Sequence, residues 1–250
     1  MNFTHLKYYF INNKTMTPKR LQRINTMLDK RQPDLTVCME GLHKSHNLAA
    51  VVRTCDAIGV SDVHAVWKSE EAEVRGGSAA GSQNWIDVHN YHKTTDAIAA
   101  MKAQGMQILV TNLSDTAVDF REIDYTKPTA IILGQEKFGT SDVALALADQ
   151  DIVVPMVGMV QSLNVSVACS VVLYEAQRQR QLAGMYDTPK LSHERRQRVL
   201  FEGGHPIFAD ACQRKGLPYP IIDEEGNIIA EEVWWRKMQM DKSAWQQLDD

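Results

Sequence analysis

The chain has 250 residues, of which 44% are hydrophobic and 23% are charged, and both proportions are typical of a soluble globular protein. This composition excludes a largely disordered or collagen-like chain. At about 150 residues per domain, the length suits one large domain with appendages. The formal net charge of −4, taken alone, disfavours a nucleic-acid partner.

The charge is unevenly distributed along the chain. The net charge is +5 over residues 1–37, −8 over 38–175, +4 over 176–218 and −5 over 219–250. Such segregation is typical of proteins that bind an anionic partner, but solvated helices carry similar charge runs. The distribution leaves both interpretations open.

Several features bear on the compartment. The longest apolar run, 152–160, is too short to cross a bilayer, and residues 1–15 lack the apolar stretch of a signal peptide. The eight histidines form no recognisable metal-ligand set, so we expect no metal. We expect a cytoplasmic protein without a membrane segment. The chain has four cysteines, and none of them forms a C-x-x-C pair. We predict that all four are buried free thiols: Cys38, Cys55, Cys169 and Cys212.

The N-terminal region divides into two predicted parts. Residues 1–15 show no periodicity and are predicted to be a flexible extension. Within 16–34, apolar residues recur at helical spacing over 19–31, and basic residues occupy the opposite face. This pattern predicts a basic amphipathic helix.

The region 35–183 alternates between two patterns about every 20–25 residues, as strands alternating with helices do. Short β-branched runs predict strands at 36–39, 63–67, 85–88, 107–111, 130–134 and 152–155. Helical patterns occupy 48–58, 94–104, 141–148 and 165–182. The alternation predicts an α/β domain with a mostly parallel sheet covered by helices.

The region 184–250 does not continue the alternation of strands and helices. It contains a basic helical pattern at 192–201, a second helix at 208–215 and an extended Pro-rich segment at 217–220. An acidic Gly turn at 224–227 and a Trp-rich helical segment at 231–248 follow. We interpret this region as an extension that packs on the body, not as a second enzyme domain.

Asn47, Arg53 and Thr54 lie on the helix predicted to follow a loop at 43–46. Asn47 and Arg53 are six residues apart, so a helix does not place them squarely on one face. Taken alone, the segment favours Asn47 as a helix cap and Arg53 as a solvated side chain over a functional role.

A second polar segment, Leu133-Gly134-Gln135-Glu136, follows a buried strand directly. Ligands of α/β sheets gather at the carboxyl ends of strands, and a glycine there lets a ligand approach the backbone closely. Glu136 would accept hydrogen bonds from a ligand or hold the loop. An ordinary strand-to-helix turn is the alternative.

The third segment runs from Pro155 to Ser166, as an apolar loop leading through Ser162 and Asn164 into an apolar helix. Either Ser162 or Asn164 can cap that helix. The apolar loop also suits a small apolar or aromatic ligand held beside a helix N-terminus.

In this order, the three segments resemble the motifs of the SpoU/TrmH family, a branch of the SPOUT RNA methyltransferases: N-x5-R-T, L-G-x-E and P-M-x-G to S-L-N-V-S. Flanking segments such as 120–126 and 215–220 resemble the members that methylate guanosine in tRNA. The resemblance spans roughly residues 16–240.

The resemblance implies a SPOUT fold with a C-terminal trefoil knot over about 107–182, with S-adenosylmethionine as cofactor. It implies a homodimer with the active site at the subunit interface. The expected substrate is the ribose 2′-hydroxyl of guanosine-18 in the tRNA D-loop, and the extension 184–250 would bind tRNA.

By the same resemblance, Arg53 is the catalytic residue, described as a base. Since a guanidinium is protonated at pH 7, Arg53 could instead bind a phosphate and stabilise the developing alkoxide. The positioning residues would be Asn47, Glu136, Ser162 and Asn164, and the cofactor contacts would come from Thr111, Gly134, Val154 and Leu163.

Two alternatives stand beside this function: a non-catalytic RNA-binding protein, and the same fold acting on another RNA position. The resemblance also suggests a role for the basic segments in binding RNA. We expect the basic stretches 19–31 and 178–198 to meet on one face of the dimer and to contact tRNA phosphates.

Overall fold

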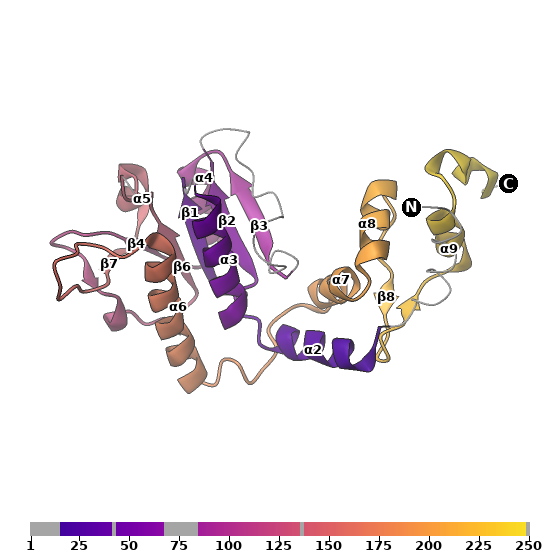
Figure 1. The fold of residues 1–250 in the computed structure, drawn as a ribbon, viewed down its shortest axis with the longest axis horizontal. Helices are drawn as coiled ribbons and strands as arrows, with labels where there is room; N and C mark the ends of the chain where they lie inside the picture. The colour runs from indigo at the N-terminus through magenta and orange to yellow at the C-terminus, as the bar shows by residue number, and fades with distance from the viewer. Residues whose placement is uncertain (1–15, 42–43, 68–84, 136–137, 249–250) are drawn as a thin grey trace. The chain divides into compact units, whose positions relative to one another are not determined.

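The structure, a computed structural model, describes residues 16–41, 44–67, 85–135 and 138–248. The chain divides into two compact units, one formed by Lys30–Lys190 and the other by Met1–Asp29 together with Leu191–Asp250 (Figure 1). Within the described ranges, no helix combines the length and apolarity that crossing a membrane requires.

A parallel sheet forms the centre of the unit Lys30–Lys190. Its seven described strands lie in the order β3-β2-β1-β6-β4-β7-β5, and every neighbouring pair is parallel, so the predicted fold class is confirmed. The strands are β1 (Leu35–Glu40), β2 (Asp62–Val66), β3 (Asp87–Tyr91), β4 (Gln107–Thr111), β5 (Val118–Asp119), β6 (Thr129–Leu133) and β7 (Gln150–Val153).

Helices cover both faces of this sheet. α3 (Ser45–Ile58) and α6 (Val165–Leu182) pack against each other on one face, in front of the strands in Figure 1. α4 (Thr94–Ala103) and α5 (Asp142–Leu147) contribute to the core of the opposite face. A short 3-10 helix, η2 (Phe120–Glu122), follows β5.

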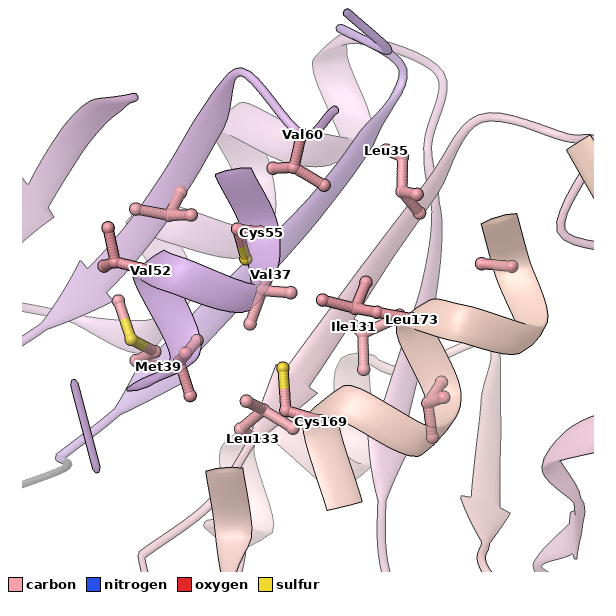
Figure 2. Close-up of a cluster of buried hydrophobic side chains, with 14 of the residues drawn as sticks. Leu35, Val37, Met39, Val52, Cys55, Val60, Ile131, Leu133, Cys169 and Leu173 are labelled. Atoms are coloured by element: carbon pink, nitrogen blue, oxygen red, sulfur yellow. The ribbon is translucent and has the colours of Figure 1, made fainter. Parts of the chain in front are cut away.

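The central strands are buried on both faces, which explains their continuous apolar runs. In β1, Val37 and Met39 point into the core beneath α3 and α6, whereas Cys38 belongs to the core beneath α4 and α5. Figure 2 shows the first of these cores, where Cys55 of α3 and Cys169 of α6 meet the side chains of β1 and β6. This rigid framework sets where the carboxyl ends of the strands lie.

The second unit is mainly helical, with α2 (Pro18–Asp29), α7 (His193–Gly204), α8 (Pro206–Lys215) and α9 (Glu232–Gln239). A hairpin of β8 (Ile221–Ile222) and β9 (Ile228–Ile229) surrounds the acidic Gly turn, and the 3-10 helix η3 (Lys242–Leu248) follows α9.

The N-terminal helix and the C-terminal extension, separate parts in the sequence, form one unit because α2 packs against α7. Arg20 Nη2 donates to the carbonyl oxygen of Gly203 at 2.6 Å, and Arg196 Nη1 lies 2.7 Å from Asp29 Oδ1. A Cβ on Gly204 would lie 2.1 Å from Met16 Cε, so a side chain there would require the flexible side chain of Met16 to move.

Candidate functional site

A cavity of about 560 Å³ lies at the carboxyl ends of three adjacent strands, β6, β4 and β7. Residues that follow each of these strands line it, together with the start of α6. Leu133, Ile152, Val154 and Leu163 provide apolar walls. Both the volume and the mixture of apolar walls with a few polar groups are typical of small-molecule sites, and the position at the carboxyl edge is where α/β sheets bind ligands.

The structure brings most of the sequence-predicted site residues to this cavity. Those that line it are Thr111, Gly134, Val154, Ser162, Leu163 and Asn164. Asn47 and Arg53 lie on α3 and are not among the lining residues. Glu136 lies outside the described residues.

The loop that follows β6 forms a narrow backbone ring. The amide of Gln135 donates to the carbonyl oxygen of Gly139, and the amide of Gly139 donates back to that of Gln135, both at 2.8 Å. A Cβ on Gly134 would lie 2.3 Å from the amide nitrogen of Thr140, so Gly134 is required by this close approach of the backbone. Thr140 Oγ1 then donates to the carbonyl oxygen of Thr111 at 3.0 Å and joins the loop to β4.

Asn164 connects the third segment to the first. Its Oδ1 accepts a hydrogen bond from the amide of Ser166 at 2.9 Å and so caps α6, as the sequence allowed. Its Nδ2 donates to Asn47 Oδ1 at 3.3 Å. Asn164 therefore joins the beginnings of α3 and α6, while Ser162 lines the cavity without capping the helix.

The start of α3 differs from the prediction. The helix begins at Ser45, so Asn47 lies inside it, and the interpretation of Asn47 as the helix cap is wrong. The residue at the cap position is Lys44, which has an extended backbone and no capping side-chain hydrogen bond. Further along, α3 packs against α6, and the hydroxyls of Thr54 and Ser170 lie 3.0 Å apart across this contact.

Arg53 projects from α3 as an exposed side chain. Its guanidinium makes no hydrogen bond or ion pair with any residue that the structure describes. A cation that none of the described residues neutralises is available to bind an anion from outside the chain.

Sequence reasoning missed Asp151, which organises the loop after β4. Its Oδ2 accepts hydrogen bonds from Ser114 Oγ and from Thr116 Oγ1, the latter at 2.9 Å. The hydrogen bond from Ser114 is the main cause that lowers the pKa of Asp151 below its usual value. The available signal was weak: Asp151 is a carboxylate near the start of the strand Gln150–Val153, directly before its apolar residues.

The cysteines do not offer a nucleophile. All four are buried free thiols, as predicted. A hydrogen bond with Cys169, reinforced by burial, raises the pKa of Cys55 well above its ordinary value, and thiols in this state are unreactive. Among the described residues, no group of three or more His, Cys, Asp or Glu side chains is arranged to hold a metal ion.

Comparison with known proteins identifies the class. The SpoU rRNA Methylase family matches residues 34–174, and the SpoU rRNA methylase C-terminal family matches residues 178–231. The chain therefore belongs to the SpoU family of RNA methyltransferases.

Individual relatives narrow the class. The tRNA (guanosine(18)-2′-O)-methyltransferase of Escherichia coli (strain K12) is 58% identical over 226 residues, which cover 90% of this chain and 99% of that enzyme. The crystal structure of the Aquifex aeolicus TrmH/SpoU tRNA modifying enzyme matches with a TM-score of 0.70 and 43% identity, over 76% of this chain and 96% of the other.

A further solved structure bears on the cofactor. The SpoU methyltransferase AviRb from Streptomyces viridochromogenes, in complex with the cofactor AdoMet, matches with a TM-score of 0.52 and 27% identity. The match covers 61% of this chain and 62% of AviRb.

Proposed function

We propose that this chain is a cytoplasmic, S-adenosylmethionine-dependent methyltransferase that acts on the ribose 2′-hydroxyl of guanosine-18 in tRNA. The observation that carries the proposal is the convergence of residues from two sequence motifs in one cavity at the carboxyl edge of β6, β4 and β7. The near full-length similarity to the Escherichia coli enzyme supports the choice of substrate.

The cavity fits the proposed cofactor. Its volume of about 560 Å³ and the apolar side chains of Leu133, Val154 and Leu163 suit the adenine ring of a nucleoside. Thr111 and the backbone at Gly134 would supply polar contacts. The cofactor would supply an electrophilic methyl group on a sulfonium.

Arg53 is the proposed catalytic residue. A ribose hydroxyl is a weak nucleophile, so the reaction needs in-line placement and stabilisation of the negative charge that develops on its oxygen. A protonated guanidinium can bind a neighbouring phosphate and stabilise that oxygen, and this role suits Arg53 better than that of a general base.

Among the described residues, Arg53 does not line the cavity of its own chain. In a dimer, Arg53 of one copy would reach the cavity of the other. We propose a homodimer whose interface includes the apolar loop after β7 and part of α6. Exposed side chains there support an interface: Val157, Met159, Val160, Val167 and Tyr174. We also propose the trefoil knot over 107–182, on the basis of family membership.

The two asparagines would act as positioning residues. The hydrogen bond between Asn164 and Asn47 fixes the start of α3, the helix that carries Arg53, against the wall of the cavity. Ser162, which lines the cavity, would contact the substrate or the cofactor directly. A role for Glu136 stays a prediction from the motif alone.

The proposal is tested by incubating the protein with labelled S-adenosylmethionine and unmodified tRNA, then mapping the methylated nucleotide. We expect label on the ribose of guanosine-18. Methylation at another position would contradict the substrate assignment, and binding of tRNA without any methylation would favour a non-catalytic RNA-binding protein.

Substitution of Arg53 tests the catalytic role. Arg53→Ala should lower turnover about 100-fold or more, since this is the usual cost of losing a group that stabilises transition-state charge. Its affinity for S-adenosylhomocysteine should change little. The matched control is Arg121→Ala, because Arg121 is exposed but already paired with Asp119. Normal turnover by Arg53→Ala would eliminate the catalytic assignment.

A further inference from the structure

Glu40, the last residue of β1, is a buried carboxylate at the edge of the sheet where the cavity opens. Its side chain is 5% exposed. Oε1 accepts hydrogen bonds from Thr94 Oγ1 at 2.5 Å and from Ser141 Oγ at 2.6 Å, and Oε2 accepts one from the amide of Ser141 at 2.9 Å. Burying a carboxylate is unfavourable unless donors surround it, and here three donors converge on one group.

Two of these donors belong to Ser141, which ends the loop that follows β6. Ser141 is also the N-cap of α5, where its Oγ accepts a hydrogen bond from the amide of Ala144 at 3.2 Å. The carboxylate of Glu40 therefore fixes the residue at which the loop returns to regular structure.

The next residue, Gly41, contacts the other end of the same loop. Gly41 has a positive φ of 64°, and a Cβ there would lie 2.7 Å from Nε2 of Gln135. A side chain at position 41 would thus displace Gln135, which lines the cavity. Glu40 thus fixes Ser141, where the loop ends, and Gly41 leaves room for Gln135 near its beginning.

This loop forms one wall of the cavity through Gly134, Gln135, Gly139 and Thr140. Glu40 itself does not line the cavity, so any effect on a ligand must pass through the loop. Building on the proposed function, we propose that Glu40 is a positioning residue for the cofactor, which keeps this wall in its binding geometry through Ser141.

The chemistry of the group explains why a carboxylate is needed. All three of its partners donate hydrogen bonds, and a carboxylate offers only acceptors. The amide of Gln has nearly the same shape but would direct an NH₂ group at one of these donors. Glu40→Gln therefore leaves a donor of Ser141 or Thr94 unsatisfied while the volume of the core is preserved.

The test compares Glu40→Gln with Thr36→Val in the full-length protein. Thr36 is buried in the same strand, near its opposite end, and its Oγ1 donates to the carbonyl oxygen of Asp62 at 2.7 Å. Thr36→Val therefore removes a buried hydrogen bond far from the loop. S-adenosylhomocysteine, which cannot react, serves as the probe in a calorimetric titration.

We expect Glu40→Gln to weaken S-adenosylhomocysteine binding about tenfold or more, because a donor left unsatisfied disturbs the loop. Thr36→Val should leave the binding within about twofold, because its lost hydrogen bond lies far from the loop. In the unliganded protein, hydrogen exchange of the Ser141 amide should accelerate at least about tenfold in Glu40→Gln and remain unchanged in Thr36→Val. Ser141→Ala should be non-additive with Glu40→Gln in both measurements.

Wild-type affinity in Glu40→Gln, or equal weakening by Thr36→Val, would overturn the positioning role. If the wild-type protein does not bind S-adenosylhomocysteine, the cofactor proposal itself fails. The exchange rate of the Ser141 amide needs no ligand, and an unchanged rate in Glu40→Gln would separately refute the contact of Glu40 with the loop.

Discussion

The two units of the chain differ in both charge and core chemistry. Lys30–Lys190 carries 14 Lys and Arg against 19 Asp and Glu, net −5, whereas the other unit carries 13 against 12, net +1. The core of the sheet unit is largely aliphatic. In the other unit, aromatic rings pack on one another, with Phe201 within 4.8–6.4 Å of the rings of Tyr219, His205 and Trp234.

This difference separates two tasks that the net charge of the whole chain conceals. The acidic sheet unit contains the cavity, and an acidic surface suits a small cationic sulfonium better than a polyanion. α2 and α7, which pack together, carry six of the 13 Lys and Arg residues of the helical unit. We therefore propose that the first unit binds the cofactor and that the second makes most of the phosphate contacts.

The largest expected effect is on the stability of the sheet unit and concerns its buried arginine, Arg180. Arg180 is fully buried, and its guanidinium donates to Asp34 Oδ1 at 2.6 Å and to the carbonyl oxygens of Tyr125 and Lys127. Arg180→Ala leaves Asp34 and these carbonyls without their donor. The free energy of unfolding should fall by about 3–5 kcal/mol, as measured by urea denaturation.

Arg178→Ala is the matched control on the same helix. Arg178 is exposed and pairs with Glu175 at 2.7 Å, so its loss should lower the free energy of unfolding far less than the loss of Arg180 does. Similar losses for both variants would show that burial does not distinguish the two arginines.

His64 should make the stability of the sheet unit pH-dependent. Its side chain is buried, Nδ1 lies 3.1 Å from Tyr91 Oη, and its ring stacks on that of His89. Burial, followed by the charge of His89, lowers the pKa of His64 from 6.5 to about 4. Between these pH values the unfolded chain binds a proton that the folded chain does not. Stability should therefore fall as the pH drops from 6.5 to 4, by up to about 3 kcal/mol.

The measurement is urea denaturation of the wild-type protein and of His64→Phe at several pH values in this interval. The variant should lose most of the slope. His193→Phe replaces an exposed histidine of the helical unit and should retain it. A wild-type slope in His64→Phe would show that other groups cause the pH dependence.

The sequence predicted those parts of the structure that depend on local patterns. The bounds of β4 and α6 match the prediction, because each is one uninterrupted apolar or amphipathic run. β5 was missed because Val118–Asp119 is only two residues long and becomes a strand through pairing with β7. The start of α3 was misplaced because no capping side chain marks it: Lys44, at the cap position, makes no capping hydrogen bond.

The same reasoning explains what could be predicted of the site. Thr111, Gly134 and Leu163 belong to motifs that follow strands, so topology alone brings them to one edge. No sequence motif of this kind marked Glu40 or Asp151 as part of the site. Their partners, such as Ser141 and Ser114, lie far away in sequence, and only the folded chain brings these hydrogen-bond donors together.

The smallest expected effect tests the assignment of phosphate contacts to the helical unit. Lys19 and Arg23 are exposed on α2, whereas Arg20 and Arg196 are engaged in the packing of α2 against α7. Lys19→Gln with Arg23→Gln should leave folding intact but reduce the dependence of tRNA affinity on salt, by about 1 in the log–log slope for each phosphate that the variant no longer neutralises. Arg236→Gln, at an exposed arginine of α9 paired with Glu232, is the control and should not change the slope. If the double variant keeps the wild-type slope, the exposed face of α2 does not contact phosphates, and other cations of the chain must bind the tRNA backbone.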